Sequence, residues 1–440
     1  MTESSTARMN GHLDEAASEA ALAEVLRRVV ARGLAEAATT GPTGGAARAA
    51  LVDELITAAL DGHARQQLRD GHPPLTAQAE ARVARRMRHA LVGLGGLQPL
   101  LDDPDIETIN IDGCDNVWAV YRDGTKARLD PIAGSDAELQ AQLRQMGAQL
   151  GVHERRFDEG YPELSMQLPG GGRLHALMSV TDRTCVSIRL HPPGRVTLAD
   201  QVARGEMTPG MARLFAAMVR ARANLAVVGG PAVGKTTLLK ALTDAIPSRE
   251  RIITVEDAYE LALSKADHPD LVAMQTRLPN IEGVGGIDMN ALLRSCLRMS
   301  PDRVIVGEVR GAEVVWMLKA MSIGIDGSMT TVHCSDSASA ALRMIAYAME
   351  PPAMYPLPAA VALVAGAVHF VIHLTLAADG VRVVSSVREI VGHDGDRVVS
   401  NEIYRPGPHG RAVPGAPLRS ATLDRLVAVG FDPDDLHDKW

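Results

Sequence analysis

The sequence predicts an α/β protein in which a larger domain built on a parallel sheet follows a smaller α+β domain. Three observations support this prediction. The chain has 440 residues, more than one ordinary hydrophobic core supports. From residue 209 to residue 332, helical and strand patterns alternate, which is typical of helices packed around a parallel sheet. A stiff, turn-forming segment, His191–Arg195, separates this region from the one before it.

The composition indicates aliphatic, helix-rich cores and argues against some functions. Hydrophobic residues make up 46% of the chain, but aromatic residues only 3%. The formal net charge of −8 argues against a protein whose main role is to coat nucleic acid, so no nucleic-acid partner is indicated. The cysteines are scattered, which favours buried thiols in a reducing compartment over a metal site. They are Cys114, Cys185, Cys296 and Cys334.

We expect neither a signal peptide nor a membrane span. Met1–Ala20 lacks the basic-then-apolar pattern of a signal peptide. The most apolar window, Leu357–Leu374, contains Gly366, His369 and His373, and we expect a buried helix that runs into a strand. These features predict a cytoplasmic protein that can still dock on a membrane complex.

Five segments are expected along the chain. The first has two helices around a break at Thr39–Gly45, and the second has strands at Ile106–Asp112 and Thr184–Leu190 and a glycine-tipped hairpin at Glu163–Met178. The expected segments are a helical, partly flexible N-terminal extension (1–74), the α+β domain (75–191), a linker (192–196), the larger domain (197–392) and a weakly patterned C-terminal tail (393–440).

A glycine-rich loop connects an apolar strand to a helix and fits the phosphate-binding loop pattern. Backbone N–H groups of such a loop wrap a polyphosphate, and the next helix directs its positive end at the same phosphates. Lys235 should reach the β- and γ-phosphates of ATP, and the Thr236 hydroxyl should ligate Mg²⁺. The residues expected to bind ATP are Gly229, Gly230, Pro231, Ala232, Val233, Gly234, Lys235, Thr236 and Thr237.

Strands are expected after this loop at Arg251–Glu256, Arg303–Val306 and Ser328–Val332, with helices between them. A βαβ series of this kind around a phosphate loop is typical of a RecA-like P-loop ATPase domain.

The ends of these strands carry side chains suited to phosphate chemistry. We interpret Glu308 as the general base or water-orienting group, with an ordinary strand-end acid as the alternative. Glu256 and Asp257 would contribute to magnesium binding, unless Asp257 only caps the next turn. His333 is either structural or in contact with the γ-phosphate or with the groups that respond to it.

Four motifs in this order resemble those of the type II/type IV secretion ATPase superfamily, and the Tad/Flp pilus (CpaF-like) and VirB-type branch is the most similar. They are the Walker A loop Gly229–Thr237, the acidic "Asp box" Ile253–Leu261, the Walker B segment Leu297–Gly311 and the "His box" Gly327–His333. The resemblance covers about residues 75–375 and includes, in the first domain, Leu101–Gly113, Gly172–Leu177 and Ser187–Arg189.

The resemblance implies a homohexameric motor that hydrolyses ATP with Mg²⁺ and drives an inner-membrane platform for pilus assembly or secretion. Such a protein would be cytoplasmic and peripheral to the inner face of the cell membrane. The resemblance also implies that arginines of the first domain reach the nucleotide when the domains close, and we favour Arg189 over Arg173. A conjugation-associated ATPase for DNA transfer and a nucleotide-sensing module with little hydrolysis are the alternatives.

The chain also departs from the pattern of its relatives. Pro231–Val233 stands where relatives usually carry Thr-Gly-Ser, Ile325 where they usually carry histidine, and Ser300 where they usually carry arginine. Cys334–Asp336 replaces the usual Ala-Asn-Ser. Since Lys235, Glu308 and His333 are retained, we expect an active but divergent ATPase; loss of the glycine at Ala232 would stiffen the loop and slow or regulate turnover.

Overall fold

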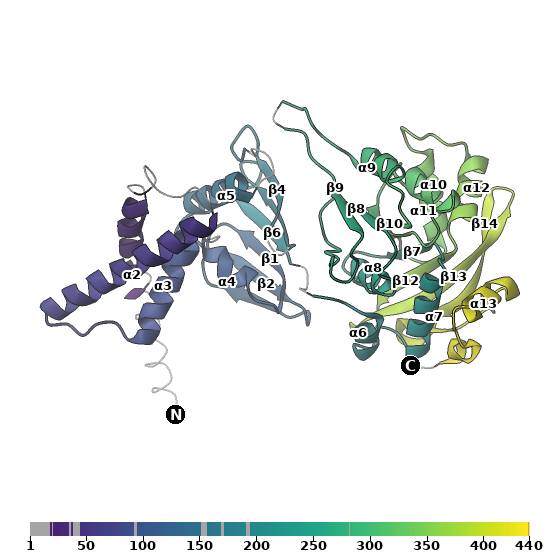
Figure 1. Ribbon diagram of the computed structural model, residues 1–440, viewed down its shortest axis with the longest axis horizontal. Helices are drawn as coiled ribbons and strands as arrows, with labels where there is room; N and C mark the ends of the chain where they lie inside the picture. Colours follow the sequence, from purple (N-terminus) through teal and green to yellow (C-terminus); the bar gives the residue numbers. More distant parts are fainter. Residues whose placement is uncertain are drawn as a thin grey trace. The chain divides into compact units, whose positions relative to one another are not determined.

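The computed structural model divides the chain into two compact units, Met1–Pro192 and Pro193–Trp440 (Figure 1). The residues that the structure describes are 18–19, 21–34, 37, 45–91, 95–150, 156–168, 171–190, 194–280, 282–438 and 440. Four predicted features lie wholly or partly outside these residues: most of the N-terminal segment 1–20, the break at 39–44, part of the glycine-rich tip at 169–170, and the prolines of the expected linker at 192–193.

The helices at the start of the first unit form a small core of their own. The helix at residues 21–34, α2 (Gly45–Arg69) and α3 (Ala77–Leu91) each contribute buried apolar side chains to it. These side chains are Ala23, Leu26, Val30, Val52, Ile56, Leu60, Val83 and Met87. Because α3 packs with the helices before it, the boundary expected after residue 74 does not separate two cores.

The rest of the first unit is a six-stranded antiparallel sheet with the order β3-β2-β1-β6-β5-β4. Its buried face packs against helix α5, where Leu139 and Leu143 meet strand residues such as Ile109 and Ile188. The opposite face is polar, as expected for an antiparallel sheet covered on one side. The elements are η1 (Gly95–Leu97), α4 (Gln98–Leu101), β1 (Ile106–Asp112), β2 (Val117–Tyr121), β3 (Lys126–Leu129), α5 (Asp136–Leu150), β4 (Glu163–Gln167), β5 (Arg173–Leu177) and β6 (Cys185–Arg189).

The second unit is built on a nine-stranded sheet with the order β15-β14-β13-β12-β7-β11-β10-β8-β9. The six strands from β12 to β9 in this order run parallel, and the three at the other edge are antiparallel. This arrangement is a RecA-like P-loop ATPase fold with an antiparallel extension. The strands are β7 (Leu225–Gly229), β8 (Ile252–Glu256), β9 (Leu271–Gln275), β10 (Arg303–Val309), β11 (Met329–His333), β12 (Phe370–Leu376), β13 (Arg382–Asp394), β14 (Arg397–Pro406) and β15 (Ala412–Pro414).

Helices cover both faces of this sheet (Figure 1). The central strand β7 is fully buried, and its side chains alternate between two cores. Leu225 and Val227 pack with residues of α7, α8 and α13, whereas Ala226 and Val228 pack with residues of α9 to α12. The helices are α6 (Leu198–Ala203), α7 (Pro209–Arg220), α8 (Lys235–Asp244), α9 (Met289–Cys296), α10 (Val314–Ser322), α11 (Ser339–Met349), α12 (Leu357–Ala367), η2 (Pro408–Gly410), α13 (Ser420–Val427) and η3 (Pro433–His437).

The C-terminal residues differ from the expected separate tail. Strand β13 runs through the boundary expected at residue 393 and pairs with β14, which in turn pairs with β15. Leu426 of α13 is 1% exposed and lies in the same core as α7 and α8. These residues therefore complete the second unit, because their backbone groups and apolar side chains are used by its sheet and core.

The second unit contains a buried ion pair between Arg303, the first residue of β10, and Glu250. Arg303 is fully buried, and its guanidinium donates to both carboxylate oxygens of Glu250 (2.7 and 3.0 Å) and to the Val219 carbonyl (2.9 Å). Removing one partner of such a pair leaves a buried charge without compensation.

We predict that Glu250→Gln lowers the free energy of unfolding by about 3–5 kcal/mol, because it leaves the Arg303 charge unpaired. Asp379→Asn is the matched control, since Asp379 pairs with Arg411 at the surface, and it should cost at most about 1 kcal/mol. Urea denaturation of both variants measures the difference. Equal losses would contradict the assignment of Glu250–Arg303 as a structural pair.

Candidate nucleotide site

The phosphate loop occupies the turn between β7 and α8. Gly234 precedes the helix with a φ of 92°, a left-handed conformation that glycine adopts without steric cost. At Gly229, an added Cβ would lie 2.5 Å from the Leu374 carbonyl oxygen and 2.8 Å from a Val233 methyl group. Both glycines are therefore required by the path of the backbone, and the loop fits a polyphosphate wrapped by N–H groups.

Ala232 lies in the middle of this loop with a φ of 59°. This left-handed conformation costs an L-residue roughly 1–2 kcal/mol relative to glycine. The alanine therefore stands at a position where the backbone favours the glycine that relatives usually carry. Alanine in place of glycine at position 232 therefore strains the loop locally.

Lys235 begins α8 and is 7% exposed. Its ammonium group donates to the carbonyl oxygens of Gly229 (3.1 Å) and Gly230 (2.6 Å), and it lies 3.3 Å from Nδ1 of His333. The ammonium is therefore held inside the loop, in the place where phosphate oxygens would meet it.

His333 connects Lys235 to Glu308. His333 ends β11, Glu308 lies near the end of the neighbouring strand β10, and Nε2 of His333 is 3.0 Å from a Glu308 carboxylate oxygen. A lysine can only donate, so Nδ1 of His333 accepts from Lys235 and Nε2 donates to Glu308. The parallel strands thus bring three predicted site residues into one hydrogen-bonded chain.

Arg310 was not predicted as a site residue, yet it holds Glu308 directly. Its guanidinium donates to both oxygens of the Glu308 carboxylate, at 2.8 and 3.1 Å, and lies 3.4 Å from Asp257. The signal available in the sequence was proximity: Arg310 lies two residues after Glu308, just past the end of β10. The carboxylate is therefore oriented from one side by Arg310 and from the other by His333.

The electrostatics of this group keep Glu308 ionised and His333 neutral. Burial alone would raise the pKa of Glu308, but the hydrogen bonds and charge of Arg310, with smaller effects of His333 and Lys235, bring this pKa below its usual value. Burial lowers the pKa of His333, and Lys235 and Arg310 lower it further, although Glu308 acts in the opposite direction. At neutral pH the site therefore offers an ionised carboxylate and an imidazole that donates a hydrogen bond.

Glu256 ends β8 and is 3% exposed. One of its oxygens accepts the backbone N–H groups of Glu260 (3.0 Å) and Leu261 (2.9 Å). Glu256, rather than Asp257, thus stabilises the turn that follows the strand. Asp257 is instead directed at Arg310 and Thr276.

The described residues contain no group of three or more His, Cys, Asp or Glu side chains placed to hold a metal ion by themselves. A magnesium ion here would depend on the half-buried Thr236 hydroxyl together with oxygens of a bound nucleotide. The glycine cradle and Lys235 fit a nucleotide polyphosphate, which would supply the remaining oxygen ligands.

Arg173 and Arg189 lie in the first unit and face each other across neighbouring strands. They form a directly opposite pair in the antiparallel ladder of β5 and β6, so both side chains lie on the same, polar face of the sheet. Like charges in opposite positions destabilise a sheet unless a counter-charge lies between them. The ladder therefore brings the two predicted arginines together on one face of the sheet.

A comparison with protein families identifies the chain. The sequence model described as "Type II/IV secretion system protein" matches residues 126–403, which is more than half of the sequence. The chain belongs to this family. Membership of a family of secretion ATPases implies ATP binding, and the family match includes the loop, Glu308 and His333.

Relatives of this type II/IV secretion system protein are found among conjugal transfer proteins. A putative conjugal transfer protein of Mycobacterium tuberculosis is 39% identical over 269 residues, which cover 59% of this chain and 74% of that protein. A probable conjugal transfer protein, TrbB, of Sinorhizobium fredii is 32% identical over 197 residues, 44% of this chain and 57% of its own length.

Solved structures to which the chain is similar include the VirB11 ATPase of the Brucella suis type IV secretion system in complex with sulphate. It shares 25% identity with a TM-score of 0.36, covering 67% of this chain and 95% of VirB11. The pilus retraction motor PilT with bound ADP shares 15% identity with a TM-score of 0.47, covering 76% of this chain and 88% of PilT.

The apolar window of this secretion-family protein folds as predicted, with α12 running into β12. None of the helices in the described ranges is long and apolar enough to cross a membrane.

The burial of Glu256 predicts a pH dependence of stability. Burial raises the pKa of this carboxyl from 4.5 to about 7, against the smaller opposing effect of its two backbone hydrogen bonds. The folded protein then binds the proton more tightly than the unfolded chain. The contribution to stability is complete below pH 4.5 and is lost as the pH rises through about 7.

We predict that the free energy of unfolding falls by about 3 kcal/mol through this group as the pH rises over that range. Glu256→Gln keeps an oxygen that accepts the two N–H groups but cannot ionise, so this variant should lose that part of the pH dependence. Urea denaturation at several pH values, on the wild type and the variant, measures it. Parallel pH profiles for the two proteins would show that Glu256 is ionised in the folded state.

Proposed function

We propose that this chain is a magnesium-dependent ATP hydrolase that works as a homohexameric motor and drives a membrane platform for pilus assembly or secretion. One observation supports hydrolysis above all others: the hydrogen-bonded chain from Lys235 through His333 to Glu308. It joins a cation that would hold the γ-phosphate to a carboxylate that would receive the proton of the attacking water. The site would lie at the cytoplasmic side of the membrane that carries the platform.

Each of the three hydrogen-bonded residues, Lys235, His333 and Glu308, has a distinct role in this proposal. Lys235 leaves the carbonyls of Gly229 and Gly230 and binds the β- and γ-phosphates, which present stronger acceptors. Glu308 orients the attacking water and takes its proton, while Arg310 and His333 fix the carboxylate in place. Because His333 contacts both Lys235 and Glu308, it would transmit the presence or loss of the γ-phosphate to the end of β10.

A conjugation-associated ATPase for DNA transfer is the second candidate, and the 39% identical putative conjugal transfer protein of M. tuberculosis favours it. The same motor core would serve either cargo, and the genes beside this one would separate the two: pilin and platform genes, or relaxase genes. A nucleotide-sensing module with little hydrolysis is favoured only by the strain at Ala232 and the departure at Ile325. Phosphate release by the purified protein separates it from both motors.

We predict that Lys235→Ala loses both ATP binding and turnover, because it removes the main cation of the loop. Glu308→Gln should keep ATP binding and lower kcat by about 10²–10⁴-fold, the usual contribution of a general base. A phosphate-release assay with a nucleotide-binding measurement tests both variants. Glu282→Gln, in the exposed loop between β9 and α9, is the matched control and should turn over like the wild type.

Wild-type turnover in Glu308→Gln would show that another group handles the water. Loss of ATP binding in that variant would show that Glu308 holds the nucleotide rather than the water.

The arginines of the first unit provide the link between chemistry and motion in this proposal. An arginine that stabilises the developing charge is worth roughly 10³–10⁵ in rate. We predict that Arg189→Ala binds ATP but loses a factor of that order in kcat, with a smaller loss for Arg173→Ala. Since the two arginines face each other, either substitution also relieves repulsion and should leave the sheet at least as stable. Phosphate release and thermal unfolding of both variants measure this.

Mixed rings decide whether Arg189 acts within its own subunit or across an interface. Arg189→Ala and Lys235→Ala subunits are each inactive in the proposal, and recovered activity on mixing means that the arginine serves a neighbour. Mass measurement with Mg-ATP checks that rings are present. Normal turnover of Arg189→Ala would show that Arg189 does not link ATP hydrolysis to motion.

A further inference from the structure

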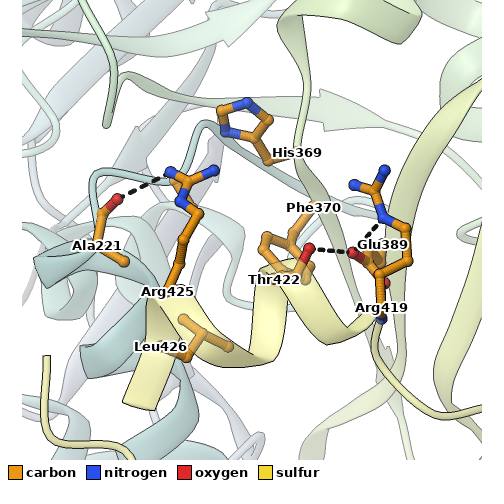
Figure 2. A pocket seen from close by; sticks show the side chains of 9 residues that line it. Ala221, His369, Phe370, Glu389, Arg419, Thr422, Arg425 and Leu426 are labelled. Atoms are coloured by element: carbon orange, nitrogen blue, oxygen red, sulfur yellow. Dashed lines mark hydrogen bonds and ion pairs between the residues drawn. The ribbon is translucent and has the colours of Figure 1, made fainter. Parts of the chain in front are cut away.

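A small pocket lies beside α13, at the edge of the sheet where the parallel strands begin (Figure 2). Phe370, the first residue of β12, lies in its wall, and β12 is in register with β7 from Leu225 onward. The phosphate loop leaves β7 at its other end. The pocket is therefore separate from the nucleotide site, with the length of β7 between them.

The pocket combines an apolar wall with basic side chains. Its volume is about 30 Å³, and the apolar part of its lining comes from Ala221, Ala223, Phe370 and Leu426. Figure 2 shows the side chains of His369 and Arg425 on one side and Arg419 on the other.

His369 lines this space with a ring whose tautomer can be assigned. Its Nδ1 accepts the backbone N–H of Asn224 at 2.9 Å, so the proton of the neutral ring resides on Nε2. Burial lowers the pKa of His369, and the charges of Arg425 and Arg419 lower it further, whereas Asp326 raises it. The ring is thus a neutral donor in a positive environment.

Arg425 supplies a charge that no carboxylate neutralises within the described part of the chain. Its guanidinium donates to the Ala221 carbonyl at 3.2 Å. Arg419, in contrast, donates to Glu389 at 2.9 Å, and Thr422 and the Arg419 backbone N–H also donate to that carboxylate. The lining therefore carries two guanidinium groups against one carboxylate that is already satisfied.

We propose that this pocket is a binding site for a carboxylate group, held by the Nε2–H of His369 and the guanidinium of Arg425. The volume corresponds to two or three water molecules, which accommodates the three heavy atoms of a carboxylate. The apolar wall suits the carbon that bears the carboxylate. A ligand bound to His369 would also affect Asn224, whose backbone N–H bonds to the His369 ring. Asn224 immediately precedes β7, and its side chain donates to the Ala367 carbonyl.

Carbethoxylation of histidine by diethyl pyrocarbonate, read for each peptide by mass spectrometry, tests this site in the full chain. The reagent attacks an imidazole nitrogen that has a free lone pair, so reaction at Nε2 of His369 requires the proton to leave that nitrogen. A carboxylate bound to Nε2–H should hold the proton there, cover the nitrogen and slow the reaction. At about 100 mM acetate, roughly tenfold above the dissociation constant expected for so small a ligand, we expect a several-fold slower reaction than in chloride of equal ionic strength. His393, which is exposed on β13, is the internal control and should react equally in both salts.

Two arginine variants distinguish the loss of ligand binding from the loss of a structural hydrogen bond. Arg425→Gln should weaken acetate protection by about tenfold, as expected for loss of a charged hydrogen bond. Arg220→Gln is the matched control, because Arg220 also donates to a single carbonyl between the same two segments, that of Val429, but does not line the pocket. It should keep full protection.

The proposal is overturned if acetate does not slow the reaction of His369, or if Arg425→Gln is protected as well as the wild type. Protection by inorganic phosphate equal to that by acetate would overturn the assignment to a carboxylate. None of these results depends on ATP hydrolysis.

Discussion

The parallel pairing of β7 with β11 and β12 is the constraint on which the second unit depends. All five residues of β7 are buried, and both neighbours pair with it from Leu225 to Gly229. This register places His333 beside Gly229 at the end of the sheet where the phosphate loop begins. Because the adjacent β10 ends at the same edge, Glu308 arrives there too. The site is thus assembled by strand register, and its residues come from three separate parts of the chain.

The electrostatics of the site follow from that assembly. Four charged or polar groups share a partly buried space, and each has a partner: Lys235 with two carbonyls and His333, and Glu308 with His333 and Arg310. A buried charge is tolerated only when it is paired in this way. A nucleotide would replace the partners of Lys235 by phosphate oxygens, and the change would pass through His333 to the carboxylate. In the proposed mechanism, nucleotide binding and catalysis would therefore be coupled through His333.

The sequence predicted the parts of this site that depend on local pattern and missed those that depend on long-range packing. The phosphate loop and Glu308 were recognisable because a strand, a glycine-rich turn and a helix follow each other directly. The contact of Arg310 with Glu308 was missed because Arg310 lies in the loop just after β10, where the direction of a side chain depends on the rest of the fold. Glu256, and not Asp257, stabilises the turn after β8. Its side chain is buried, and its carboxylate accepts the backbone N–H groups of Glu260 and Leu261. The C-terminal strands were missed although Asp394–Gly395 is a turn signal between two alternating runs.

A structure of the full chain with Mg²⁺ and a non-hydrolysable ATP analogue tests the central claim most directly. The polyphosphate should lie in the Gly229–Thr237 loop, with the Lys235 ammonium on phosphate oxygens and no longer on the Gly229 and Gly230 carbonyls. Glu308 should face the γ-phosphate across one water while keeping its contacts to His333 and Arg310. A polyphosphate bound elsewhere, or a Lys235 ammonium still bonded to the two loop carbonyls, would contradict it.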